Sequence, residues 1–562
     1  MKHPYYILGL AAALAVATPS FAQNDGDRND GKYNPTVSGS IQSDMLAPTG
    51  SQSDGSHEDF RTNTFVDLNV MSKYIDAGAR FEYREHQLPG YDAAFKGYGV
   101  PYVYLKAKLK NFEVTVGNFY EQFGSGFVLR TYEERSLGID NSLLGARIVT
   151  TPVKGVRLKA LTGQQRRYWA HNDSWVSGAD VELSLDSWFK GLAQSGTSLT
   201  LGGSFVNKNE RNDEDVPFNG NYRLVMPRNV NAWDARVTLN THGFNVLAEY
   251  AQKTADPSFK NNYIYRKGTA AMLSASYSKK GFSVLAQAKR SDNFFFNSYR
   301  GESLTQSTIN HLPAFTMDQT YALAALYPYG TRLDGEWAYQ GQLGYKFKRK
   351  TAIGGKYGMM VKVNFSHVRG IDQNPRSLTV NVPEPTVLTG RGTDGYGSAF
   401  WKWGKGGMYY QDLNVQIDRR FTRDFKLSLM YMNQFYNKTV VEGEGGMIHS
   451  NIFIADALFN LSPKTRLRTE LQYLTTGEDE HDWLFALAEL SLVPHWMFTV
   501  SDQYNVGLTD AHYWQTFVTY NTGAHRVQLG WGRTRAGFNC SGGVCRYVPE
   551  TKGFTLSYNY NF

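Results

Sequence analysis

Alternating segments, joined by connections of two lengths, constrain the fold of this 562-residue chain more than any other feature. Residues 103–110 alternate Val, Leu and Ala with Tyr and Lys, and residues 112–117 repeat the pattern after a tight turn at Lys110 and Asn111. Successive side chains of a β-strand point to opposite faces, so each segment predicts a strand with one apolar and one polar face. The chain is therefore expected to be all-β.

Short and long connections between these segments are expected to alternate strictly along the chain. Short ones recur at residues 110–111, 153–155, 241–243, 279–281, 462–464, 493–495 and 521–523, and longer ones are centred on 89–98, 121–141, 167–173, 207–224, 254–264, 292–331, 370–405, 441–447, 477–481, 507–511 and 536–548. Transmembrane barrels have short periplasmic turns at one end and longer extracellular loops at the other. The pattern predicts a single antiparallel transmembrane β-barrel of about 24 strands, within a range of about 22 to 26.

Composition agrees with one barrel over residues 35–562. No run of about 18 apolar residues follows Ala22, and the mean hydropathy is -0.44, which excludes a bundle of membrane helices. Aromatic residues nevertheless make up 14% of the chain, with 36 Tyr, and no linker divides it. Lipid contacts only every second side chain of a barrel strand, so a polar average is expected.

The first 34 residues are expected to lie outside the barrel. Lys2 and His3 precede an apolar stretch at 7–17 and small residues at Ser20 and Ala22, which predicts a signal peptide over residues 1–22. Residues 23–34 are rich in Asp, Asn and Gly and predict a short periplasmic tail. This tail is far too short to form a plug domain.

The last nine residues alternate completely, with Phe554, Leu556, Tyr558, Tyr560 and Phe562 on one face. This segment resembles the closing strand of bacterial outer-membrane barrels, in which Phe554, Tyr558, Tyr560 and Phe562 would act as the signal for the barrel-assembly machinery. It is expected to pair with the first strand near residues 36–41, because an open edge is not tolerated in lipid. The resemblance implies the outer membrane of a Gram-negative cell, periplasmic termini, and lipids, the assembly machinery and other outer-membrane proteins or lipoproteins as partners.

Charged residues gather on the predicted lumen faces, because a charge at the lipid midplane costs about 2 to 4 kcal/mol. Arg80, Arg84, Lys106 and Lys108 are expected to form a basic stripe on neighbouring strands. The net charge of +8 is modest for this length. This charge would bias a pore toward anions, but a mixed-charge surface is the favoured interpretation.

Residues 117–147 form the most distinctive stretch. It combines Gly residues and an apolar run at 127–129 with a dense group of polar residues, namely Arg130, Tyr132, Glu133, Glu134, Arg135 and Asp140. Such apolar residues require a packing surface, so residues 118–141 are expected to fold inward and narrow the lumen as porin constriction loops do. Packing across the barrel mouth without a transport role is the alternative. Gly-Ser-Gly-Phe-Val-Leu-Arg at 124–130 and Leu-Gly-Ile-Asp-Asn-Ser at 137–142 also resemble a family of uncharacterised outer-membrane barrels, which implies no activity.

Two long loops carry aromatic residues with other possible roles. Phe294, Phe295, Phe296 and Tyr299 in one, and Tyr396, Phe400, Trp401 and Trp403 in the other, suit sugar stacking or protein docking if exposed. For Trp401 and Trp403, anchoring at the outer membrane interface is the favoured interpretation.

Other site chemistries are not expected. Cys540 and Cys545 flank a Gly-Gly turn, a spacing that favours a local disulfide over zinc or redox chemistry. The 12 His residues match no nucleophile elbow or metal helix, so neither an enzyme, a cofactor, a metal site nor nucleic-acid binding is expected.

The leading hypothesis is a porin-like channel for passive passage of small hydrophilic solutes. The alternative is a plugged docking barrel in an outer-membrane complex.

Overall fold

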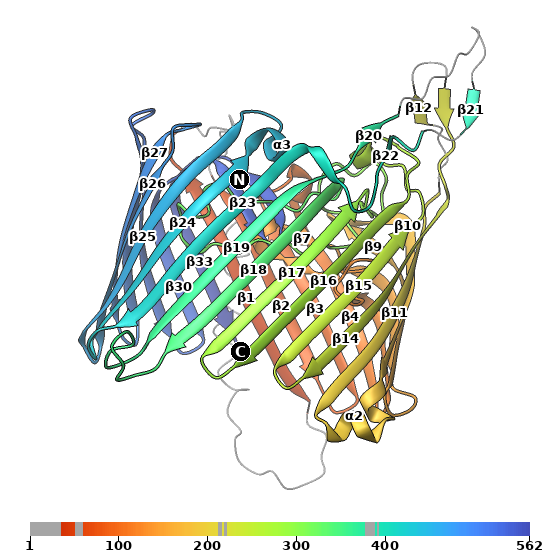
Figure 1. The fold of residues 1–562 in the computed structure, drawn as a ribbon, viewed down its shortest axis with the longest axis horizontal. Helices are drawn as coiled ribbons and strands as arrows, with labels where there is room; N and C mark the ends of the chain where they lie inside the picture. Colours follow the sequence, from red (N-terminus) through yellow and green to blue (C-terminus); the bar gives the residue numbers. More distant parts are fainter. Residues whose placement is uncertain (1–34, 51–59, 212–215, 219–221, 377–387, 391–392) are drawn as a thin grey trace, which may run out of the picture.

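The computed structural model describes residues 35–50, 60–211, 216–218, 222–376, 388–390 and 393–562. The predicted signal peptide and tail lie outside these residues. The described chain forms one closed barrel of tilted strands (Figure 1). Among the described residues, no helix has the length and apolar character needed to cross a membrane.

The barrel contains 24 strands in an antiparallel sheet, as predicted. The strands are β1 (Thr36–Pro48), β2 (Arg61–Met71), β3 (Ile75–Arg84), β4 (Gly97–Leu109), β5 (Phe112–Phe119), β8 (Leu143–Thr150), β9 (Val156–Arg167), β10 (Ala170–Ser184), β11 (Thr197–Asn209), β14 (Asn229–Thr241), β15 (Phe244–Lys253), β16 (Gly268–Lys279), β17 (Phe282–Asp292), β18 (Gly335–Phe347), β19 (Met359–Ile371), β23 (Trp403–Arg420), β24 (Phe425–Asn437), β25 (Met447–Ser462), β26 (Thr465–Thr475), β27 (Asp482–Leu492), β28 (Trp496–Val506), β29 (His512–Thr522), β30 (His525–Thr534) and β33 (Thr551–Asn561).

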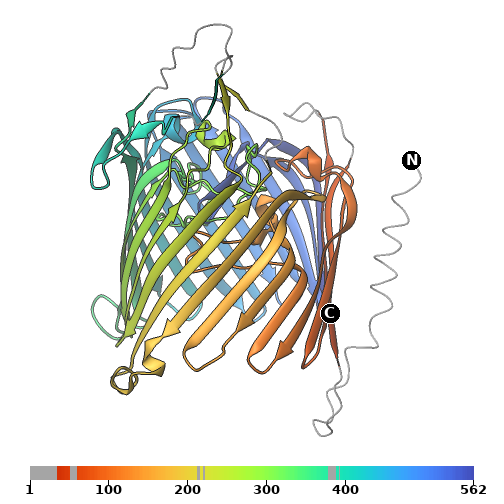
Figure 2. The ribbon, with the colours of Figure 1, turned by 90° about the vertical axis from the view of Figure 1, so that its right-hand side faces the viewer.

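Short elements lie in the connections. They are η1 (Ala93–Phe95), β6 (Glu133–Glu134), η2 (Arg135–Leu137), β7 (Ile139–Asp140), η3 (Leu185–Ser187), α2 (Lys190–Gln194), β12 (Val216–Phe218), β13 (Tyr222–Leu224), η4 (Phe259–Asn261), β20 (Asn374–Pro375), β21 (Leu388–Gly390), β22 (Tyr396–Gly397), α3 (Lys438–Glu442), β31 (Gly537–Ser541) and β32 (Val544–Val548). Most of them lie at one end of the barrel (Figures 1 and 2).

The two ends of the barrel differ in their connections, as predicted, but the alternation is not strict. One end, the turn end, carries the tight turns and the carboxyl terminus, and the other, the loop end, carries most of the long connections (Figure 2). The prediction of a long loop at 167–173 is wrong, because β9 and β10 pair up to Arg167 and Ala170 and leave only Tyr168 and Trp169 between them. The turn end also has two longer connections, at 185–196 and 348–358.

The closing strand pairs with the first strand, as predicted. β33 pairs with β30 on one side and with β1 on the other. The register joins Ser40 to Asn561 and Pro48 to Gly553, so the contact lies further along β1 than the expected residues 36–41 and overlaps them only in part. Every barrel strand thus has two neighbours, and no strand edge is left in lipid.

The alternation along the strands separates an apolar outer face from a polar inner face. Val103, Leu105 and Leu109 of β4 are exposed on the outside, whereas Lys106 and Lys108 face the lumen and pair with carboxylates. On β3, Arg80 and Glu82 are buried in the interior. This apolar band is the surface that a transmembrane barrel presents to lipid.

Candidate functional site in the lumen

The connection between β5 and β8, residues 120–142, lies inside the barrel and is called here the first inward loop. Phe123, Phe127, Val128 and Leu129 have no exposed surface. Its backbone contacts the inner face of the wall, since Lys159 Nζ donates to Gln122 O at 2.9 Å and Ser125 N donates to Glu249 at 3.2 Å. The apolar run at 127–129 therefore packs within the lumen.

A second loop, residues 293–334 between β17 and β18, folds inward beside the first and is called the second inward loop. Arg130 N donates to Ile309 O at 2.8 Å, and His311 N donates to Gly126 O at 2.9 Å. Phe294 and Phe296 have no exposed surface, so the expectation that these rings are free for sugar stacking or docking is wrong. A long polar connection ordinarily lies on the surface, which is why the sequence predicts exposed rings here. The two inward loops together are called the plug.

The plug is anchored on the opposite wall as well. Leu323 N donates to Gln472 Oε1 of β26 at 2.8 Å. Gln434 Nε2 of β24 donates to Tyr327 O at 3.1 Å, and Tyr327 OH donates to Asp479 at 3.0 Å. The second inward loop thus reaches from β17 to β24 and β26, which lie four and six strands further around the barrel.

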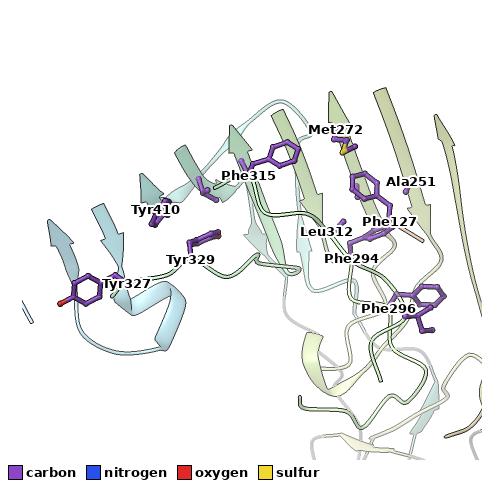
Figure 3. Close-up of a cluster of buried hydrophobic side chains, with 14 of the residues drawn as sticks. Phe127, Ala251, Met272, Phe294, Phe296, Leu312, Phe315, Tyr327, Tyr329 and Tyr410 are labelled. Carbon is purple, nitrogen blue, oxygen red and sulfur yellow. The ribbon is translucent and has the colours of Figure 1, made fainter. Parts of the chain in front are cut away.

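A continuous apolar cluster joins the plug to the wall (Figure 3). In Figure 3, Tyr329 of the plug lies beside Tyr410 of the wall, with ring centroids 5.4 Å apart. The wall contributes residues from β5 to β27, namely Phe119, Leu143, Leu161, Val176, Val206, Val230, Ala232, Ala251, Ala270, Met272, Ala338, Val368, Tyr410, Met430, Met432, Tyr436, Ile448, Ile452, Ile454, Leu474 and Trp483. An inner face bathed in water would be polar. These departures from the polar pattern mark the part of the lumen that the plug covers.

A buried ionic cluster fixes the first inward loop to the wall near β3 and β9. Arg166 pairs with Glu82 at 2.8 Å and with Asp140 at 2.6 Å, and Arg80 pairs with Asp140 at 3.0 Å and Glu133 at 2.9 Å. The side chains of Arg166 and Glu82 are each only 1% exposed. Burial alone would raise the pKa of Asp140, but the guanidinium groups of Arg166 and Arg80 hold it below its ordinary value. The carboxylate therefore stays ionised as their partner.

The structure brings together some of the residues predicted for a constriction and separates others. Arg135 joins the ionic cluster through Asp67 at 2.8 Å and Glu133 at 2.6 Å. Arg84 pairs with Glu82 at 3.2 Å. Lys106 and Lys108 lie apart from it and pair with Glu113 at 3.8 Å and Asp76 at 2.7 Å. The four predicted basic residues thus share the inner face of β3 and β4, and each pairs with an acidic side chain. Arg84 shares Glu82 with Arg166, and Lys106 shares Glu113 with Arg147.

The remaining three predicted residues of the first inward loop, Arg130, Tyr132 and Glu134, have local partners. Glu134 accepts hydrogen bonds from Ser136, and Arg130 lies over the Tyr132 ring at 4.8 Å. Their role as a solute filter stays a prediction.

Arg166 is the residue that sequence reasoning missed. Strict alternation from Lys159 would place it on the outer face with Leu158 and Ala160, yet it is buried against the plug. The pairing of β9 with β10 shifts register between His171 and Trp175, so the regular alternation ends before Arg166. Only the neighbouring pair of Gln residues at 164 and 165, polar on both faces, signals that this end of the strand is not in lipid.

A model of a family of unknown function, DUF6029, matches residues 2–562. The chain belongs to this family. No curated protein matches it. Among solved structures, it is similar to the translocation pore of the P pilus usher PapC, with 10% identity, a TM-score of 0.45 and coverage of 94% of this chain and 99% of that one.

Two further solved structures show the range of similar barrels. The siderophore receptor PirA of Pseudomonas aeruginosa has 10% identity and a TM-score of 0.41, over 96% of this chain and 81% of the receptor. OccAB3 of Acinetobacter baumannii has 9% identity and a TM-score of 0.35, over 94% of this chain and 99% of that one.

The last loop of this DUF6029 barrel closes over the plug as a small hairpin. β31 and β32 pair, and Cys540 and Cys545 form a disulfide between them. Thr331 N of the second inward loop donates to Gly543 O at 2.8 Å, and Asn539 Nδ2 donates to Ser136 O at 3.3 Å. The hairpin therefore contacts both inward loops.

Reduction of this disulfide is expected to loosen the hairpin and leave the DUF6029 barrel intact. The bridge closes a loop with a sequence separation of only five residues, and the barrel is held by its strand ladder instead. Amide hydrogen exchange before and after reduction should show faster exchange at residues 537–548 and no change in β30 and β33. Faster exchange throughout the barrel would contradict the local role of the bridge.

Proposed function

We propose that this protein is an outer-membrane channel for small hydrophilic solutes whose loop end is closed at rest by its own plug. The observation that carries the proposal is the division of the lumen into two zones. At the loop end, apolar wall residues are covered by the plug. Toward the turn end, lumen-facing cations are open, with side-chain exposures of 52% for Arg157, 49% for Lys362 and 42% for Lys426.

The size of the barrel supports this proposal. Barrels of about 16 to 18 strands leave an aqueous channel, and those of about 22 strands hold a plugged lumen. A barrel of 24 strands is too wide for side chains alone to fill. The inward loops occupy that space, and solutes would pass when they move aside.

The proposal includes a location and an orientation. The turn end, with both ends of the barrel sheet, would face the periplasm, and the loop end would face the outside, as in outer-membrane barrels. Membrane lipids and the barrel-assembly machinery would be its general partners. The ionic pairs of Arg80 and Arg135 would hold the closed state rather than select solutes.

A plugged docking barrel is the second candidate, favoured by the anchoring of the plug on both walls of the lumen. Planar-bilayer conductance separates the two. The native protein should give rare or small openings, and replacement of residues 294–333 by a short turn should give steady pores. This turn can bridge β17 and β18 because they are paired neighbours.

A milder variant covers the case in which the shortened protein fails to fold. Gln472→Ala removes the side-chain acceptor of Leu323 N and keeps the whole chain, so openings should become more frequent. If neither variant conducts while both form barrels, the channel proposal fails and the docking barrel is supported.

A further inference from the structure

A cavity of about 540 Å³ lies at the loop end, between the plug and the disulfide hairpin. Its lining comes from both inward loops, from the loop after β15 and from the hairpin, with Val441 of α3 at its edge. Sites for small molecules typically measure about 300 to 1,000 Å³ and combine aromatic walls with a few placed polar groups. The cavity is of this size, and solutes entering from the loop end would meet it before the plug.

Three aromatic side chains from three different segments line this cavity. Tyr132 belongs to the first inward loop, Phe295 to the second, and Phe538 to the hairpin. All three are half-buried, so each keeps part of its ring surface uncovered. Flat apolar faces of this kind suit the apolar face of a sugar ring, whose hydroxyl groups then need hydrogen-bonding partners at the edge.

Polar groups with unused hydrogen-bonding capacity line the same cavity. Asn310 Oδ1 and Thr331 Oγ1 are buried and have no hydrogen-bond partner among the described residues. Buried polar atoms are ordinarily paired, by protein, water or ligand. Both oxygens are covered in the empty cavity, so they would accept hydrogen bonds from the hydroxyl groups of a saccharide only after a small side-chain movement.

One unbalanced positive charge completes the lining. The Lys260 side chain has no hydrogen bond or ion pair within the described part of the chain, and burial lowers its pKa to about 8. The nearby Glu302 already pairs with Arg167 at 3.1 Å. The other cation of the cavity, Arg332, pairs with Asp334 at 3.1 Å. Lys260 is therefore free to bind an anionic group of a ligand.

We propose that this cavity binds a small saccharide that carries one carboxylate, of the uronic acid type. Its ring would lie against the aromatic side chains, and its carboxylate would lie at Lys260. This inference deepens the proposed function, since it makes the sugar acid the solute of the channel. Binding itself does not depend on conductance.

Calorimetric titration of the full-length protein in detergent tests the proposal, with glucuronate and glucose as probes. Glucuronate should bind more tightly than glucose. Lys260→Met should weaken glucuronate binding about tenfold or more, because a hydrogen bond to a charged group is lost, and should leave glucose binding unchanged. Lys260→Arg, which keeps the charge, should retain most of the affinity. Lys280→Met, in an exposed tight turn at the opposite end of the barrel, is the matched control and should bind like the native protein.

Equal glucuronate affinity in the native protein and Lys260→Met, or no binding of glucuronate by a correctly folded native protein, would overturn the proposal. Its failure is distinct from failure of the channel. Conducting pores without glucuronate binding would refute only the sugar-acid site. Glucuronate binding in a barrel that never conducts would refute the channel and leave the site as a receptor on a docking barrel.

Discussion

Replacement of Arg166 by Met is expected to release the first inward loop and destabilise the protein by about 3 to 5 kcal/mol, the usual cost of removing one partner from a buried ion pair. The guanidinium binds both oxygens of Glu82, at 2.8 and 2.9 Å, and Asp140 at 2.6 Å. Without it, two buried carboxylates lose their main counter-charge. Denaturant unfolding in detergent should report the loss of stability, and bilayer recordings should show more frequent openings.

Arg157→Met is the matched control for this variant. Arg157 lies on the same strand, β9, but its side chain is 52% exposed and its ion pair to Glu182 is 3.9 Å long. Exposed pairs of this kind contribute about 0 to 1 kcal/mol. If Arg166→Met unfolds at the same denaturant concentration as Arg157→Met, the ionic cluster does not hold the plug.

Val500→Arg is expected to destabilise the barrel by about 2 to 4 kcal/mol, the cost of a charge at the lipid midplane. Val500 lies in the middle of β28 and is 55% exposed on the outer face. The arginine would have to displace lipid contacts without a partner. Unfolding from lipid vesicles by denaturant measures the effect.

The adjacent residue provides the control for the assignment of faces. Ser501 pairs with Leu487 and Gln515 and points to the lumen, so Ser501→Arg should change stability by less than about 1 kcal/mol. An equal loss of stability in both variants would show that Val500 does not face lipid while Ser501 faces the lumen.

The barrel and most of its faces follow from local patterns that a single strand already contains. The alternation around Leu105 and Lys106 predicts which side chain enters lipid, because neighbouring strand positions always point to opposite faces. The register shift near Arg166 and the two-residue turn at Tyr168 do not follow from such patterns. They depend on how β9 and β10 pair at the loop end of the barrel.

The contents of the lumen were only partly predictable, because they also depend on more than local patterns. The apolar run at 127–129 predicts an inward loop, since those side chains need a packing surface. Phe294 and Phe296 also need a packing surface when they are buried. Rings exposed at a membrane interface or at a binding surface would give the same sequence pattern, so the sequence does not separate these cases. The cluster that Phe294 and Phe296 join draws its wall residues from strands spread between β5 and β27, most of them far away along the chain.

The sequence alone therefore determined a closed barrel of about 24 strands with an apolar outside and segregated turns, because these features depend on local alternation and on the lipid solvent. Only the tertiary structure decided that the second long loop joins the first inside the lumen and that the residues of the basic stripe pair with acidic side chains. Both outcomes depend on contacts between residues widely separated in the chain, such as Arg130 with Ile309 and Arg166 with Glu82. No local pattern encodes such pairs.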